Sequence, residues 1–214
     1  MKARKILAVS LTAAMTLALA ACGGSSSDKE SSSKDSSDKV YKIGICQQLE
    51  HADLDEATKG FEEACEEKFG KDKVKFDLQN GQGEQANCAT IVNNFVADND
   101  DLILANATTA LQCAAAATST IPILGTSVTD YATALDISDW TGSTGMNISG
   151  TCDLAPIDEQ EAMLKELLPD AKTVGILYCS AEPNSAYQAK KFEEALEKDG
   201  IKYKESTAAD SNEI

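Results

Sequence analysis

The sequence has few of the side chains from which metal centres and enzyme active sites are commonly built. It contains one histidine, His51, and none of its seven cysteines pair at the close spacing of metal or redox motifs, so no metal site is expected. Gly81 and Gly83 resemble part of a dinucleotide-binding loop, but the full G-x-G-x-x-G pattern is absent. No nucleophile elbow, phosphate loop or zinc signature occurs. These absences argue against an enzyme and against a bound cofactor.

Basic side chains are also scarce. The chain has 19 lysines and arginines against 35 aspartates and glutamates, which gives a formal net charge of −16. Lys2, Arg4 and Lys5 precede a long apolar segment, and without these three the charge becomes −19. Such an acidic excess disfavours binding to nucleic acid or to anionic lipid.

The first 21 residues have the pattern of an export signal. The basic start is followed by the apolar stretch Ile6–Ala21, which is short for a membrane-spanning helix. The segment ends in Leu19-Ala20-Ala21-Cys22, which resembles the lipobox of bacterial lipoproteins. We therefore expect residues 1–21 to be a lipoprotein signal peptide, and Cys22 to be lipidated, with palmitate among its acyl groups. The alternative is an ordinary secretory signal followed by an unrelated cysteine.

The segment after the lipobox is rich in serine. Residues 23–39 contain no apolar side chain, so they cannot form a core, and we expect residues 22–39 to be a flexible tether. Each buried CH₂ of an acyl chain contributes roughly 0.8 kcal/mol, and one chain alone binds a bilayer only marginally. A diacylated Cys22 would therefore hold the protein at the extracytoplasmic face of the cell membrane without spanning it.

From Tyr41 onward, short apolar runs alternate with longer segments of helical periodicity. The predicted strands are residues 41–46, 73–79, 101–106, 121–127, 173–179 and 201–206. Between them the apolar residues recur at helical spacing, as Val92, Phe95 and Val96 do. Such alternation predicts βαβ units, and hence an α/β fold with doubly wound parallel sheets.

The alternation stops in the glycine- and hydroxyl-rich residues 138–153 and then resumes. We infer an N-terminal α/β lobe at residues 40–148 and an incomplete second α/β lobe at residues 149–214. Two strands and two helices are too few for a doubly wound lobe. The chain is therefore expected to be the N-terminal part of a longer protein.

Six cysteines remain after Cys22. Cys46 ends a predicted strand, while Cys65 and Cys113 lie in helical patterns, where a small core residue is typical. Disulfides form outside the cytoplasm, but the spacing favours buried thiols.

Polar residues follow every predicted strand. In parallel sheets, ligands bind at the carboxyl ends of the strands, near the point where the strand order reverses. The N–H groups at the start of the next helix suit a carboxylate or a phosphate, although the same polar residues also serve as ordinary N-caps. After residues 173–179, Glu182 lies near Asn184 and Ser185. This places an ammonium acceptor beside carboxylate donors, which favours a zwitterion over a phosphate.

These segments resemble one family. Similarity to ABC-transporter substrate-binding lipoproteins of the tryptophan/tyrosine (aromatic amino-acid) type is carried by KIGICQQLEHADLDEATKGF, LILANATTALQCAAAAT, IPILGTSVTDYATALD, STGMNISGTCDLAPIDEQ and VGILYCSAEPNSAYQ. The resemblance implies a type I periplasmic-binding-protein fold, in which two α/β lobes close on a ligand; here the second lobe would be truncated.

The resemblance also implies a set of ligand contacts. In the first lobe these are Gln48, His51, Asn106, Ala107, Thr108, Thr126, Ser127 and Asp130. In the second lobe they are Ser180, Glu182, Asn184, Ser185, Tyr187, Asp210 and Ser211.

Three residues have a second interpretation. His51 either contacts the ligand or begins a surface helix. Trp140 either stacks on an aromatic ligand or packs in a core. Tyr187 either closes over the ligand or packs against its neighbours.

Together these features predict the extracytoplasmic solute-binding component of an ABC importer. It would capture an amino acid, with an aromatic one favoured, and deliver it to a permease, with no nucleic-acid partner. One alternative is a sensor or receptor ectodomain of the same fold for another small polar molecule, although a lipobox in place of a membrane span argues against it. An enzyme that uses the same crevice is the other alternative.

Overall fold

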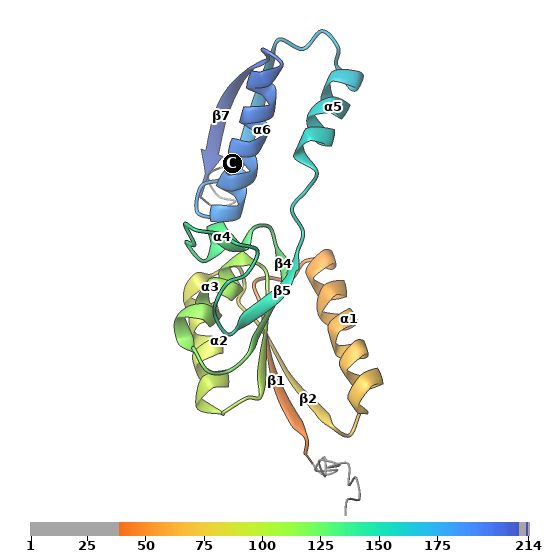
Figure 1. The fold of residues 1–214 in the computed structure, drawn as a ribbon, viewed down its shortest axis with the longest axis vertical. Coiled ribbons are helices and arrows are strands. Elements are labelled where there is room, and N and C mark those ends of the chain that lie inside the picture. Colours follow the sequence, from red (N-terminus) through yellow and green to blue (C-terminus); the bar gives the residue numbers. More distant parts are fainter. Residues whose placement is uncertain (1–38, 210–212, 214) are drawn as a thin grey trace, which may run out of the picture. The chain divides into compact units, whose positions relative to one another are not determined.

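The computed structural model describes residues 39–209 and 213, and its first sheet has five parallel strands (Figure 1). The strands are β1 (Tyr41–Gln47), β2 (Val74–Asn80), β3 (Leu102–Asn106), β4 (Ile123–Val128) and β5 (Ile148–Cys152). Their order is β2-β1-β3-β4-β5. The order therefore reverses between β1 and β3, which is where ligands bind in sheets of this kind.

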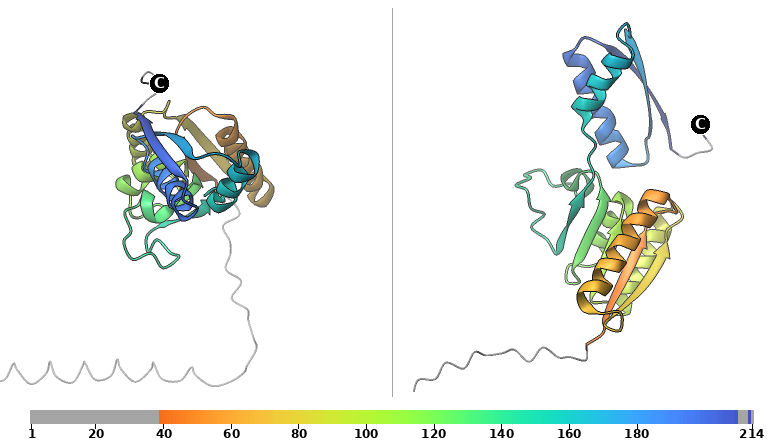
Figure 2. Two further views of the ribbon diagram at one scale, coloured as in Figure 1. Left: turned by 90° about the horizontal axis from the view of Figure 1, so that it is seen from above. Right: turned by 90° about the vertical axis from the view of Figure 1, so that its right-hand side faces the viewer.

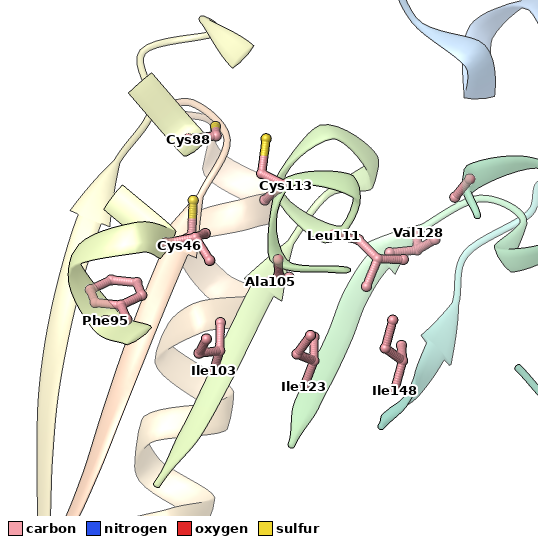
Figure 3. Packing of buried hydrophobic residues seen from close by; sticks show 14 of the residues in the cluster. Cys46, Cys88, Phe95, Ile103, Ala105, Leu111, Cys113, Ile123, Val128 and Ile148 are labelled. Carbon is pink, nitrogen blue, oxygen red and sulfur yellow. The ribbon is translucent and has the colours of Figure 1, made fainter. Parts of the chain in front are cut away.

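Helices cover both faces of this sheet, as the two orientations of Figure 2 also show. The helices of this part are α1 (Ala52–Phe69), α2 (Gln85–Ala97), α3 (Thr108–Ala117) and the short α4 (Tyr131–Ala134). On the face of α1, Ile43, Ile45 and Leu104 form a buried cluster with Cys65. On the face of α2 and α3 lies a larger core (Figure 3). The predicted doubly wound arrangement is confirmed for the first lobe.

The two cores follow from the period-two geometry of the strands. In β3, Ile103 faces the α2/α3 core and Leu104 faces the α1 core, because successive side chains of a strand point to opposite faces. Phe95 of α2 is 1% exposed, and burying a side chain of this size contributes roughly 1.5–3 kcal/mol.

A second, two-stranded parallel sheet follows. It consists of β6 (Thr173–Cys179) and β7 (Lys202–Ala208), accompanied by α5 (Ile157–Leu167) and α6 (Pro183–Lys198). Lys165 of α5 pairs with Glu161 on its own helix and with Asp199 at the end of α6, which joins the two helices. The sheet leaves some apolar surface exposed, since Leu177 is 62% exposed.

Two elements were absent from the sequence prediction. β5 pairs with β4, so the first sheet runs to Cys152, past the lobe boundary inferred at 148. The other is α4, a single turn whose start is capped by Asp130. Neither has a periodic apolar pattern, because β5 is buried only at Ile148 and α4 is four residues long.

The cysteines are free thiols in the part of the chain that the structure describes. Cys46, Cys65, Cys88 and Cys113 are buried, as the sequence favoured, whereas Cys152 is exposed. None of the helices within residues 39–209 combines the length and apolar character that a membrane span needs.

Candidate functional site

The carboxyl ends of the first sheet bring four polar residues to one level. The parallel register places Gln47 opposite both Asn80 and Asn106, and Asn106 opposite Thr126. Backbone hydrogen bonds continue past the strands: Gln48 N donates to Asn106 O at 3.1 Å, and Ala107 N donates to Thr126 O at 3.0 Å. The loops after β1, β3 and β4 are therefore held side by side, as the sequence predicted from strand-end chemistry.

A buried polar network fixes this edge to α1. Gln47 donates from Nε2 to Asp55 Oδ1 at 2.6 Å and accepts the Thr58 hydroxyl at 2.8 Å. Asn106 donates from Nδ2 to Thr58 Oγ1 at 2.9 Å and to Leu54 O at 2.8 Å. The network leaves one buried acceptor unpaired, Asn106 Oδ1. A buried acceptor without a donor is costly, and such groups concentrate at functional sites.

Two residues at this edge have backbone conformations that glycine would adopt more easily. Ala107, the N-cap of α3, has φ 89° and ψ 163°, and Ser127 at the end of β4 has φ 55°. Positive φ in residues other than glycine costs of order 1–3 kcal/mol and is typical of binding loops. Both residues belong to the predicted contact set.

Gln48 connects the first sheet to the loop after β6. Its side chain is buried, with Oε1 accepting from Thr109 N at 3.2 Å and Nε2 donating to Glu182 Oε1 at 3.0 Å. The Gln48 side-chain amide thus accepts a hydrogen bond from one of the backbone N–H groups in the first turn of α3, which have no partner within the helix.

The Glu182 carboxylate is held by neutral donors. Its second oxygen, Oε2, accepts from the Ser185 hydroxyl at 3.2 Å. Glu182 occupies the N-cap position of α6, yet its side chain makes no capping hydrogen bond. The carboxylate is therefore directed to Gln48 and Ser185 and not to its own helix. Neither of these two partners is a cation, so the carboxylate is available to an ammonium group.

Two other predicted contacts act as helix caps. His51 accepts at Nδ1 from Asp53 N at 3.3 Å, and its side chain is 57% exposed, which supports the surface-helix interpretation. Asp130 accepts at Oδ1 from Thr133 N at 2.7 Å. Neither makes a hydrogen bond to the other predicted residues among those that the structure describes.

The remaining predicted residues are divided. Thr108 is buried at the start of α3, while Ser180 is exposed and donates from its backbone to Ala208 O at 3.0 Å. Asn184 is half-buried in the first turn of α6. Tyr187 lines a hollow of about 350 Å³ together with Leu154, Ala155, Ile157, Asp158, Lys191, Glu194 and Lys198. Cys22, Asp210 and Ser211 lie outside the described residues.

Sequence reasoning missed part of the site. Gln47 and Thr58 were not selected, although both are buried polar residues that position the strand ends. The signal was present in part, because Gln47 extends an apolar strand with an amide side chain. Thr109 contributes through its backbone N–H, which no residue type reveals.

The interpretation of Trp140 as a core residue was wrong. Its side chain is 43% exposed and lines a hollow of about 290 Å³ beside β5. Tyr131 lies in the same hollow and donates to Gly125 O at 3.0 Å and to Thr151 O at 3.1 Å. Burial raises the pKa of Tyr131 to about 12, so the hydroxyl that links β4 to β5 stays protonated.

Comparison with known proteins identifies the family. Residues 42–214 match the family described as ABC transporter substrate binding protein. The chain belongs to this family.

Within residues 39–209 and 213, no group of three or more histidine, cysteine or acidic side chains is arranged to hold a metal ion.

Individual relatives support this assignment. A tyrosine-binding protein of Clostridioides difficile (strain R20291) is 36% identical over 219 residues, which cover all of this chain and 63% of that protein. An ABC domain in complex with L-Trp from Streptococcus pneumoniae is 35% identical with a TM-score of 0.77, covering 82% of this chain and 60% of that one. A conserved domain protein from Vibrio cholerae is 33% identical with a TM-score of 0.76, covering 81% and 59%.

The chain thus spans about 60% of the length of these relatives. The likeness confirms the predicted type I periplasmic-binding-protein architecture and the resemblance on which it was based.

Proposed function

We propose that this chain belongs to the extracytoplasmic solute-binding component of an ABC importer, which captures an aromatic amino acid and delivers it to a permease. The observation that carries the proposal is the 36% identity over the whole chain to a tyrosine-binding protein. The relative in complex with L-Trp, at 35% identity, supports an aromatic ligand independently. The protein would be a binding protein and not an enzyme.

The chemistry of the strand ends supports a zwitterionic ligand. Glu182 offers a carboxylate whose hydrogen-bond donors are neutral, so an ammonium group would be a stronger partner than either of them. The first turn of α3 offers N–H groups that suit a carboxylate. The Gln48 side chain bonds both the Glu182 carboxylate and the N–H of Thr109. A bound ligand would replace Gln48 as the partner of one or both of these groups.

The N-terminal sequence supports a location at the membrane. The lipobox Leu19–Cys22 and the serine-rich residues 23–39 are the pattern of a tethered lipoprotein. We propose that Cys22 carries the acyl chains and that the binding domain stands outside the membrane on this tether.

Calorimetric titration of the whole protein with L-tyrosine, L-tryptophan, L-phenylalanine and N-acetyl-L-tyrosine tests the proposal. We expect binding of one or more of the free amino acids without turnover, and no binding of the acetylated compound, because it lacks the ammonium. Product formation, or equal binding of the acetylated compound, would contradict the proposal.

The variant Glu182→Gln tests the assigned ammonium acceptor. A hydrogen bond to a charged group contributes roughly 1.5–3 kcal/mol, so the substitution should weaken binding by about tenfold to a hundredfold. Glu67→Gln, an exposed carboxylate on α1, is the matched control and should leave the affinity unchanged. If Glu182→Gln binds as tightly as the unsubstituted protein, the ammonium lies elsewhere.

A further inference from the structure

The side chain of Gln48 bonds two loops that are far apart in the sequence. Its Oε1 accepts from Thr109 N, in the first turn of α3, at 3.2 Å, and its Nε2 donates to Glu182 Oε1, at the N-cap of α6, at 3.0 Å. These partners lie 61 and 134 positions further along the chain. One amide group therefore bonds a backbone donor and a carboxylate at the same time.

This bonding pattern matches the one proposed for the ligand. A primary amide carries an acceptor oxygen and a donor nitrogen on one carbon, while a free amino acid carries an acceptor carboxylate and a donor ammonium on adjacent carbons. The α3 N–H group is the proposed partner of the carboxylate, and Glu182 is the proposed partner of the ammonium. Gln48 thus bonds the same kinds of group that the two charged ends of the ligand would bond.

Only the side chain of Gln48 would have to move to free these groups. The residue is 5% exposed, and its backbone is held at both ends. Gln48 N donates to Asn106 O at 3.1 Å, and Gly83 N donates to Gln48 O at 2.8 Å. These backbone bonds involve neither Thr109 nor Glu182. A change of side-chain rotamer therefore breaks both amide contacts and leaves the strand end in place.

A charged ligand would form stronger bonds than the amide does. At Thr109 N, a carboxylate would replace a neutral acceptor, and hydrogen bonds to an ionised group are roughly twice as strong as neutral ones. At Glu182, an ammonium would replace a neutral donor by a cation. A zwitterion can therefore displace the Gln48 side chain, but the two amide bonds have to be broken first.

We propose that Gln48 is an internal competitor of the ligand, which joins the loop after β1 to the start of α6 until an amino acid displaces it. The inference rests on the proposed function and concerns the regulation of the same site. Only the fraction of molecules with the side chain released is competent to bind, so the apparent dissociation constant is the intrinsic one divided by that fraction. This role is the opposite of the ligand contact that the resemblance implied for Gln48.

Calorimetric titration of Gln48→Ala with L-tyrosine and L-tryptophan tests the sign of the effect. We expect the whole protein with this substitution to bind each amino acid about tenfold more tightly, because no internal contact has to be broken first. The factor should be the same for the two amino acids, since the same contact is broken whatever ring the ligand carries.

A second variant separates hydrogen bonding from packing. Gln48→Met has a side chain of similar length and volume that forms neither bond, so it should show the same gain in affinity. Gln160→Ala, an exposed glutamine on α5, is the matched control and should leave the affinity unchanged.

Two measurements report on the contact itself. Without added amino acid, hydrogen exchange at Thr109 N should be faster in both Gln48 variants, because its acceptor is gone. In the unsubstituted protein, saturation with L-tyrosine should shift the ¹⁵N NMR signals of the Gln48 side-chain NH₂ group. The NMR measurement remains decisive if a variant fails to fold, and signals that do not move on saturation would overturn the inference.

The outcomes separate this inference from the proposed function. Weaker or unchanged binding by Gln48→Ala and Gln48→Met would overturn the inference, while binding by the unsubstituted protein would leave the proposed function intact. A gain for L-tryptophan alone would reflect added space for the larger ring and would also overturn the inference. If the unsubstituted protein binds no amino acid, the proposed function is wrong, and the inference falls with it.

Discussion

At the scale of single residues, backbone conformation marks the candidate site more clearly than side-chain type does. Ala107 has an unremarkable side chain, yet its φ of 89° places it where glycine is preferred. Both backbone groups of Ala107 are hydrogen-bonded. Its carbonyl oxygen accepts from Leu111 N of α3, and its N–H donates to Thr126 O of β4, both at 3.0 Å. The surrounding bonds therefore hold a strained conformation in place.

Replacing this residue should relieve the strain. We expect Ala107→Gly to raise the free energy of unfolding by about 1 kcal/mol, since the relief of roughly 1–3 kcal/mol exceeds the added entropy of the unfolded chain. Ala110→Gly, in the buried interior of the same helix, should lower it by about 1 kcal/mol or more. Urea unfolding with an unchanged m-value measures both. A loss of stability in Ala107→Gly would show that its conformation is not strained.

Close packing limits another position. A Cβ on Gly44 of β1 would lie 2.4 Å from Phe95 Cγ, within the main core. Gly44→Ala should therefore lower the free energy of unfolding by about 1–3 kcal/mol, as overpacking does. Gly60, inside α1, has nothing within 4 Å, so Gly60→Ala should raise it by about 0.5–1 kcal/mol. Chemical denaturation of the pair should give shifts of opposite sign; equal shifts would refute the packing argument.

At the scale of elements, the amino end of the first sheet carries neighbouring carboxylates in opposite environments. Burial, together with repulsion from Asp98 and Asp77, raises the pKa of Asp100. The pKa of Asp101 is lowered because its carboxylate bonds Lys39 at 2.6 Å and Lys42 N at 3.0 Å. Both residues lie in the turn between α2 and β3, so the difference arises from their partners: Asp101 bonds Lys39 and Lys42 N, whereas Asp100 is buried near other carboxylates.

The two carboxylates should therefore affect stability with opposite pH dependence. Because the pKa of Asp100 is raised in the folded protein, its contribution to the free energy of unfolding is fully present below about pH 3.8. This contribution is lost as the pH rises through the pKa of the folded state. Asp100→Asn should consequently gain stability relative to the parent between pH 4 and pH 7.

Asp101 provides the matched control on the same loop. Its lowered pKa gives a contribution that is present above about pH 3.8 and is lost as the pH falls through the folded value. Asp101→Asn should lose stability at pH 7, and the loss should shrink below pH 4. Urea midpoints of parent and variants at several pH values measure both trends. Parallel curves for the two variants would contradict the assignment.

At the scale of the whole molecule, the acidic composition of the chain bears on the anchor proposed at Cys22. The acidic excess disfavours binding to anionic lipid, so under the proposed function the acyl chains at Cys22 would supply the attachment to a membrane. Cys22 lies outside the described residues, and a substitution there tests the proposed anchor directly.

The anchor prediction concerns one sulfur. Cys22→Ser should move the protein expressed in bacteria from the membrane fraction to the released fraction and should abolish incorporation of labelled palmitate, because the diacylglycerol thioether cannot form. The exposed Cys152→Ser is the control and should leave both unchanged. Incorporation that persists in Cys22→Ser would place the lipid elsewhere.

The sequence by itself determined the alternation of strands and helices, the parallel sheet and the polar strand ends. Each of these depends on local periodicity: Ile43 and Ile45 alternate toward one face of a strand, and Val92 and Phe95 recur along a helix, whatever packs against them. The family resemblance added most of the candidate contacts.

Only the tertiary structure decided which strand ends lie together. The order β2-β1-β3-β4-β5 sets Gln48 beside Asn106, and the packing of α2 and α3 on the sheet gathers Cys46, Cys88 and Cys113 in one buried cluster. The tertiary structure also includes β5 in the sheet. Its five residues have no periodic apolar pattern of their own, and they form a strand by pairing with β4. Such contacts join residues distant in the chain, and they are selected by the packing of whole elements, which local spacing does not encode.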